Sequence, residues 1–193
     1  MTSLELAGKL NQAFQGKLSD PVEFRGEVTL FLHDAQLIKD ICAFAKADLG
    51  FNYLVDLSSV DEGDQSPRFT LVYELYGYTH RCHLRIKTAV SEEDPVLPTV
   101  CDVWRTANWH EREVYDMMGI RFKGHPDLRR ILMWEGYPYF PLRKDFPLSG
   151  KPTALPEVAF TRSAPLEGGP FVTIPGGTDT QAREPRVRIP ESD

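Results

Sequence analysis

Charged side chains are concentrated in the segment WHEREVYDMMGIRFKGHPDLRRIL, residues 109–132. Three acidic residues and one arginine lie within its first eight positions, and a histidine and a pair of arginines follow. Carboxylates and guanidinium groups at this density can form an acid/base site or a network of charge-assisted hydrogen bonds. These residues are Glu111, Arg112, Glu113, Asp116, His125, Arg129 and Arg130.

Enzyme motifs do not fit this segment. The sequence HERE begins like the zinc-protease motif H-E-x-x-H, but Val114 stands where the second histidine is needed. Glu111 and Glu113 are two residues apart, so on a helix they face nearly opposite ways and cannot act as an acid/base pair. A stand-alone enzyme using His110, Glu111 and Asp116 therefore lacks a nucleophile, a metal site and a phosphate-binding loop.

A second group of candidate ligands is the sequence HRCH, which contains His80, Cys82 and His83. Cys101 and His110 could join these residues in space to bind zinc. On a strand, successive side chains point to opposite faces, so Cys82 and His83 point apart. Structural zinc sites prefer paired ligands on turns, and we therefore expect no metal ligands in this chain.

The composition indicates a globular protein of a reducing compartment. The chain has 193 residues, of which 41% are hydrophobic, and this suits one domain or a domain with a long appendage. A formal net charge of -6 argues against a general nucleic-acid-binding protein. Three widely spaced cysteines without a C-x-x-C pair indicate neither a disulfide framework nor a thiolate cluster.

Hydrophobic periodicity and turn residues predict the elements that position the charged segment. Apolar residues at helical spacing predict a helix near the N-terminus, followed by a strand at 27–32 and by a helix that Asp34 caps and Gly50 ends. Three consecutive strands are then predicted at 51–60, 68–77 and 79–90. Short connections favour antiparallel pairing of these strands.

This order predicts an α+β domain over residues 1–137, in which helices pack on one face of an antiparallel sheet. A further helix is predicted through 97–118. Its second part begins at Asn108, with Glu111 completing a capping box, and it ends at Gly119. The charged residues thus fall on the last turns of this helix and on the basic segment after it.

Proline marks a boundary after the predicted domain. Ten of the fifteen prolines lie in residues 138–193, where seven basic and seven acidic side chains cancel. Two interpretations remain open for this tail, a disordered terminus and an extended arm that orders on a partner. Recurring apolar residues such as Leu155, Phe160 and Phe171 favour the partner-docking arm.

The region before the tail has the composition of an interface. All three tryptophans and nine of the 21 aromatic residues lie within 104–146, and six basic side chains lie within 121–144. Protein interfaces concentrate aromatic residues and arginine. The alternatives are a helix end with ordinary ion pairs four residues apart, or a local RNA-binding module with Trp134, Tyr137 and Tyr139 as stacking platforms.

The sequence EREVYDMMGIRFKGHPDLRRIL closely resembles the signature segment of one subunit, designated C, of the proton-pumping NADH:quinone oxidoreductase, respiratory complex I, and PLRKDFPLSG resembles its second hallmark. One departure is WEGYPYFPLRKD, which carries additional residues around Tyr137 to Phe140, whereas the family runs almost directly from tryptophan and glycine into PLRKD. The positions that match are Glu111, Arg112, Glu113, Asp116, Gly119, His125, Pro126, Leu128, Arg129, Arg143, Lys144, Asp145 and Pro147.

The resemblance implies a protein without redox cofactors or catalytic residues of its own, in the peripheral arm of the complex. It implies contact with the large subunit that helps form the quinone site, designated D, which we call the quinone-site subunit. It also implies contact with neighbouring iron-sulfur subunits, while FMN and the iron-sulfur clusters belong to partner subunits.

The sequence also bears on where the chain is found. It shows no signal peptide and no apolar run of the roughly 20 residues that cross a bilayer. We therefore expect a peripheral protein on the cytoplasmic side of the bacterial inner membrane, which meets the membrane only through the complex.

A rival remains, the equivalent subunit of a related membrane-bound hydrogenase or of another complex I-like enzyme. In either assembly we expect a partly buried ion-pair network that fixes the helix end and orients the basic segment. The later residues Arg143, Lys144 and Asp145 are expected to dock on the partner, and residues 138–193 to lie along its surface. The network comprises Glu111, Arg112, Glu113 and Asp116, paired with Arg129 or Arg130.

Overall fold

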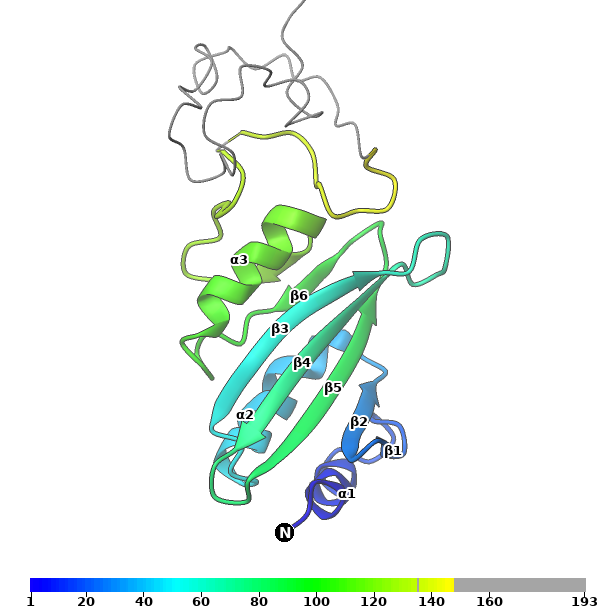
Figure 1. Cartoon of the computed structure of the whole chain (residues 1–193), viewed down its shortest axis with the longest axis vertical. Helices are drawn as coiled ribbons and strands as arrows, with labels where there is room; N and C mark the ends of the chain where they lie inside the picture. Colours follow the sequence, from blue (N-terminus) through cyan, green and yellow to red (C-terminus); the bar gives the residue numbers. More distant parts are fainter. Residues whose placement is uncertain (135, 148–193) are drawn as a thin grey trace, which may run out of the picture.

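The computed structural model describes residues 1–134 and 136–147 (Figure 1). No helix among these residues is long and apolar enough to cross a membrane. The elements in chain order are α1 (Ser3–Ala13), β1 (Val22–Phe24), β2 (Glu27–Leu32), the 3-10 helix η1 (Ala35–Leu37), α2 (Ile38–Ala47), β3 (Tyr53–Asp61), β4 (Phe69–Gly77), β5 (Cys82–Val90), β6 (Val96–Pro98), α3 (Ala107–Met118) and β7 (Arg121–Lys123).

A five-stranded sheet in the order β1-β2-β5-β4-β3 forms the body of the molecule. The three consecutive strands β3, β4 and β5 are antiparallel neighbours, so the α+β class and the mainly antiparallel sheet are confirmed. One pair departs from the prediction, because β2 runs parallel to β5, with Leu30 opposite Ile86. The connection through η1 and α2 is long enough to carry the chain across the sheet, so β2 need not pair with the next strand in sequence.

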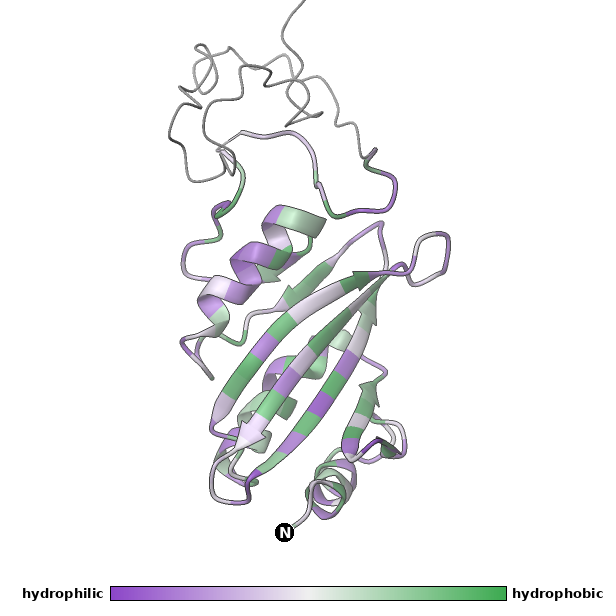
Figure 2. Ribbon diagram, viewed as in Figure 1, coloured by the Kyte–Doolittle hydropathy of each residue, from purple (hydrophilic) through white to green (hydrophobic). Residues whose placement is uncertain are grey.

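One face of the sheet is buried and the other is open to solvent. Along β5, Leu84, Ile86, Thr88 and Val90 are buried, and the residues between them are not. This alternation follows from the period of two in a strand, and Figure 2 shows it as alternating bands along β3, β4 and β5. Helices α1 and α2 contribute their apolar stripes to the same hydrophobic core, and α2 lies behind the sheet in Figure 1.

The predicted helix at 97–118 is wrong in its first half. Helix α3 covers only Ala107–Met118, residues 99–106 form turns and irregular backbone, and Val96–Pro98 form β6, which pairs in parallel with β7. Pro98 explains the extended backbone at Leu97, because a proline disfavours helical backbone at the residue before it. The predicted end of the helix is confirmed, since Gly119 caps it with φ 78°.

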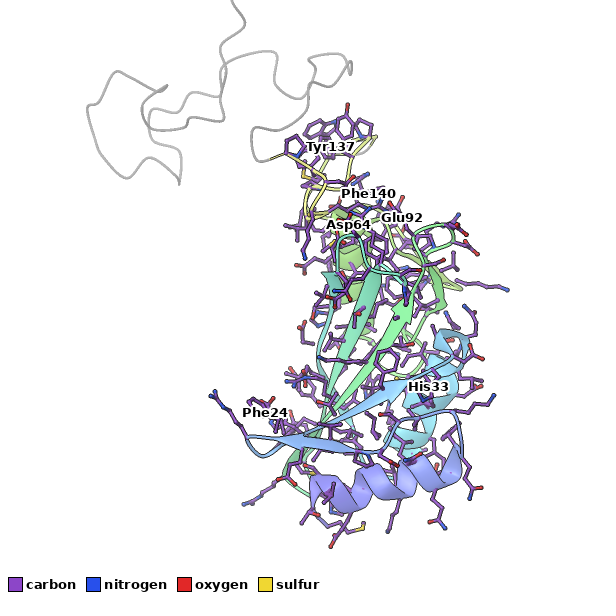
Figure 3. The ribbon with its side chains drawn as sticks, turned by 90° about the vertical axis from the view of Figure 1, so that its right-hand side faces the viewer. Phe24, His33, Asp64, Glu92, Tyr137 and Phe140 are labelled. Atoms are coloured by element: carbon purple, nitrogen blue, oxygen red, sulfur yellow. The ribbon has the colours of Figure 1, made fainter. Side chains whose placement is uncertain are left out.

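The chain leaves β7 and returns along α3 as irregular backbone, which we call the strap (residues 125–134 and 136–147). The strap crosses the end of α3 and reaches the β3–β4 loop (Figure 1). Figure 3 shows Tyr137 and Phe140 of the strap at the same end of the molecule as Asp64 and Glu92, far from Phe24. The first part of the predicted tail, 138–147, thus packs on the domain, and residues 148–193 lie outside the described residues.

Candidate functional site

Asp116 is the acceptor around which the strap is organised. It lies on the last turn of α3 with its side chain fully buried. Its Oδ2 accepts hydrogen bonds from three successive backbone N–H groups, those of Ile131 (3.0 Å), Leu132 (2.7 Å) and Met133 (2.8 Å). Burial alone would raise the pKa of Asp116, but these N–H groups and the Arg130 guanidinium hold that pKa below its ordinary value.

Arg130 completes the coordination of this carboxylate. Its Nη1 lies 2.6 Å from Asp116 Oδ1 and also donates to the Asp116 carbonyl oxygen at 2.9 Å. Its Nη2 donates to the carbonyl oxygen of Tyr139, and its guanidinium lies over the rings of Tyr137 and Phe140 at 5.6 Å and 5.1 Å. Tyr137 and Phe140 therefore form an aromatic cover for Arg130.

Two other charged residues of α3 behave differently from Asp116. Arg112 binds no carboxylate within the described residues, because its Nε and Nη2 donate to the carbonyl oxygens of Arg129 (3.1 Å) and Arg130 (3.2 Å). Glu113 is exposed and makes no hydrogen bond or ion pair within residues 1–134 and 136–147. Hence the ion pair at the helix end joins Asp116 to Arg130, and Arg112 supports the same strap through its backbone.

Glu111 is buried without a cationic partner among the described residues. Its Oε1 accepts from the Val100 N–H at 2.7 Å, and its Oε2 accepts from the Thr99 hydroxyl at 2.5 Å and from the Cys101 thiol at 3.4 Å. Burial raises its pKa to about 7 although these hydrogen bonds oppose the shift. The predicted capping box with Asn108 is wrong, because Thr106 is the N-cap and the Glu111 carboxylate ties α3 to the turn after β6.

His125 closes the other side of this pocket. Its Nε2 lies 3.2 Å from the Asn108 carbonyl oxygen, and its Nδ1 accepts from the Asp127 N–H at 3.0 Å. An acceptor at Nδ1 requires the proton to be on Nε2, so the imidazole is neutral. Burial, followed by the nearby Arg112 charge, lowers the pKa of His125 and favours the same state.

Potential metal ligands gather at one point in the described part of the chain. There, Cys101, Glu111 and His125 form the one group of three potential ligands, with ligand atoms within 4.8 Å of one another. A metal on Nε2 would need the lone pair that the Nε2 proton occupies. In this hydrogen-bonding state His125 offers no Nε2 lone pair to a metal, and the rejected zinc ligands His80, Cys82 and His83 do not form a group of three among the described residues.

Asp61 and Arg68 fix the far end of the strap. Asp61 accepts from the Lys144 N–H (2.8 Å), the Gly63 N–H (2.9 Å) and the Arg68 guanidinium (2.8 and 2.9 Å), and this guanidinium holds the pKa of Asp61 well below its usual range. Arg68 also binds Asp145 at 2.6 Å. Two of the residues predicted to dock, Lys144 and Asp145, thus already contact the β3–β4 loop.

Arg143 and Gly119 join the strap to the end of α3. The Arg143 Nε donates to the Met118 carbonyl oxygen at 2.7 Å, and its guanidinium stacks on the rings of Phe140 (4.6 Å) and Phe69 (5.1 Å). A Cβ on Gly119 would lie 2.7 Å from Arg143 Nη2 and from the Phe140 ring. Only glycine meets both requirements at this position, the positive φ and the close approach.

Sequence reasoning missed Asp61, Arg68 and Thr99. Asp61 and Arg68 flank the predicted loop between two antiparallel strands, so their opposite charges could have indicated a pair that closes the loop. The partner Asp145 lies 77 positions from Arg68, and no local pattern connects them. Thr99 was missed because a helix was predicted at this position.

Within the described residues, the buried carboxylates of Glu111, Asp116 and Asp61 bind backbone N–H groups and so fix the path of the chain. The family described as "Respiratory-chain NADH dehydrogenase, 30 Kd subunit" matches residues 31–152. In Geotalea uraniireducens, the NADH-quinone oxidoreductase subunit that is designated C is 46% identical over 142 residues, which cover 74% of this chain and 86% of that protein. The chain belongs to this family, and the expectation of a subunit of an oxidoreductase complex, instead of a stand-alone enzyme, is confirmed.

Two solved structures share the fold. One is described as "Nqo5 of the trypsin-resistant fragment (1-134)", with a TM-score of 0.56 and 37% identity, covering 66% of this chain and all of that chain (100%). The other belongs to the membrane-bound sulfane sulfur reductase, an archaeal respiratory membrane complex, with a TM-score of 0.65 and 22% identity over 75% of this chain and 85% of that chain. At that identity the second likeness concerns the fold alone.

Proposed function

We propose that this chain is a cofactor-free structural subunit in the peripheral arm of NADH:quinone oxidoreductase. In this role it docks the quinone-site subunit and so supports electron transfer from NADH to quinone coupled to proton translocation. FMN and the iron-sulfur clusters are carried by partner subunits. The observation that carries this proposal is the Asp116 carboxylate, which binds three successive N–H groups of the strap.

A fixed strap suits a docking role for energetic reasons. Asp116 and Arg130 hold its middle, and Asp61 and Arg68 hold its far end. A segment that is ordered before association loses less conformational entropy when the complex forms. The buried ion pair contributes little net stability by itself, so its value lies in the shape that it imposes.

The distribution of the cysteines supports the absence of a redox centre from this chain. Cys42 is buried in the core, and Cys101 donates to Glu111. Iron-sulfur clusters need several thiolates gathered at one point, and three separated cysteines do not meet that requirement. We assign the protein to the cytoplasmic side of the bacterial inner membrane, where it contacts the membrane only through the complex and binds no nucleic acid.

The three residues predicted to dock differ in how much of each remains free to contact a partner. Arg143 and Asp145 make contacts within the chain, and the Lys144 backbone N–H binds Asp61. The side chain of Lys144 and one edge of Asp145 remain exposed and are available to a partner. Residues 148–193 are proposed to extend the contact along the surface of the quinone-site subunit.

Affinity capture from gently solubilised membranes of the source organism tests the proposal. The full tagged chain is expected to recover the quinone-site subunit, the iron-sulfur subunits and NADH:quinone reductase activity. A matched variant that ends at Pro147 keeps every described residue and is expected to recover less of the quinone-site subunit. Recovery of a nickel hydrogenase in place of the NADH-oxidising subunits would favour the rival assembly, and recovery of the chain alone would contradict both.

A further inference from the structure

Trp109 is unusually exposed for a residue of its size. Its side chain is 60% exposed on α3, two turns before Asp116. Burying a tryptophan side chain contributes more free energy than burying almost any other, so an exposed one leaves a large potential gain unused. In a chain that acts inside a complex, this gain is available to a partner.

Arg112 holds this tryptophan in place. The Arg112 guanidinium lies 5.1 Å from the centre of the Trp109 ring while it donates to the carbonyl oxygens of Arg129 and Arg130. The cation is thus fixed by the strap, and it covers part of the indole. An aromatic side chain restrained in this way loses little rotamer freedom on binding, and tryptophan and arginine are the residues that hot spots favour.

Charge defines the kind of partner that fits. Arg105 lies four residues before Trp109, Arg112 three residues after it and Glu113 four residues after it, while Arg129, whose carbonyl oxygen binds Arg112, is already paired with Asp127. The surface is locally basic although the chain carries a net charge of -6. An acidic protein surface complements it, whereas a nucleic acid would be repelled by the remainder of the chain.

A second exposed apolar side chain lies on the strap, two turns of α3 further along. Leu132 is 62% exposed, and its backbone N–H donates to Asp116. The same carboxylate that fixes the strap therefore also fixes a second apolar contact. We call Arg105, Trp109, Arg112 and Arg129 the Trp109 surface.

We infer that the Trp109 surface is a docking site for a partner subunit that presents an apolar side chain flanked by carboxylates. The apolar group covers the free part of the indole, and the carboxylates pair with Arg105 and Arg112. This inference rests on the proposed function and names the contact that the strap serves. It adds a contact that does not depend on Arg143, whose side chain is engaged within the chain.

The test compares two equally exposed aromatic residues in the full chain. Trp109→Ala is expected to lower the recovery of partner subunits about tenfold or more. Tyr78→Ala is the matched control, because Tyr78 is also 60% exposed but lies in the turn between β4 and β5. Its recovery is expected to equal that of the unchanged chain, and the thermal unfolding of both variants establishes that they are folded.

A second variant tests the same surface. If Trp109→Ala does not fold, Arg105→Glu replaces it, since Arg105 is exposed and precedes the helix, and the same loss is expected. Normal recovery with Trp109→Ala and Arg105→Glu, together with a loss on truncation after Pro147, would overturn this inference and leave the proposed function intact. If the unchanged chain captures no respiratory subunit, the proposed function is overturned. If the Trp109 surface binds RNA in a salt-sensitive way, the inference is overturned.

Discussion

Two carboxylates of α3, Asp116 and Glu111, are equally buried but have opposite surroundings. Asp116 faces a guanidinium and three peptide N–H groups of the strap. Glu111 faces one N–H, one hydroxyl and one thiol, with no cation among the described residues. The pKa falls below its ordinary value for Asp116 and rises to about 7 for Glu111. Burial alone therefore does not set the direction of a pKa shift. The hydrogen-bond and charge partners of the buried group decide whether its pKa rises or falls.

This difference separates two roles within one helix. Asp116 is a charged anchor that orders the chain after the helix, while Glu111 joins the helix to the segment before it through hydrogen bonds that a neutral acid can also make. The comparison predicts unequal effects of removing each group.

Removal of the charged anchor is expected to have the largest effect. Asp116→Ala leaves Arg130 buried without its partner and leaves three N–H groups unsatisfied, so the free energy of unfolding should fall by about 3–5 kcal/mol. Chemical denaturation measures this change. A loss below about 1 kcal/mol would mean that water replaces the carboxylate easily, and the anchor role would be wrong.

The pH dependence of stability is expected to have opposite signs at the two sites. The folded pKa of Glu111 is raised from its ordinary 4.5 to about 7, so the folded state binds more protons and stability falls as pH rises through this window, by an amount on the order of 3 kcal/mol. The pKa of Asp116 is lowered from 3.8, so its contribution is present above that value and is lost as pH falls below it.

Glu111→Gln isolates the first of these effects. The amide imitates the protonated acid, since its oxygen can accept from Val100 and its NH₂ group can donate to Thr99. We expect equal stability of variant and unchanged chain at about pH 5 and a more stable variant at about pH 8. Parallel pH profiles from denaturant unfolding would contradict the neutral-acid role of Glu111.

The close contact between the helix end and the strap predicts a smaller loss. Gly119→Ala adds a Cβ at φ 78°, 2.7 Å from Arg143 and Phe140, and should cost about 1–3 kcal/mol. Gly16→Ala is the matched control, because Gly16 also has positive φ (74°) but has open space around its Cβ position. Equal losses in thermal unfolding would mean that only backbone strain matters at Gly119.

The smallest effect is expected at Arg112. Arg112→Lys keeps the charge but cannot reach two carbonyl oxygens in the fork geometry of a guanidinium, so stability should fall by about 1 kcal/mol. Unfolding in denaturant measures this loss of stability. A loss as large as that of Asp116→Ala would mean that Arg112 anchors the strap as strongly as Asp116 does.

The sequence predicted the strands correctly where the hydrophobic pattern continues over many residues. The strand predicted at 27–32 is β2, Glu27–Leu32, and the three consecutive strands also formed. The three-residue strands β1, β6 and β7 were missed because three positions carry too little alternation to stand out. The parallel pairing of β2 with β5 depends on a crossover that local patterns do not encode.

The site was predictable where opposite charges lie close in sequence. Asp116 and Arg130 are 14 positions apart, and one of the two expected arginines is the partner. The role of Glu111 was misassigned because a capping box and a tertiary contact require the same residue type. The role of Asp61 depends on a contact with Lys144 that lies 83 positions away, beyond any local pattern.

Hydrogen exchange of the strap amides tests the central claim most directly. In the full chain with Asp116→Asn, the amides of Ile131, Leu132 and Met133 should exchange roughly tenfold faster or more, since the acceptor loses its charge. Glu111→Gln should leave these three rates unchanged. Unchanged rates in the Asp116 variant would show that the strap is ordered without its carboxylate, which would contradict the account.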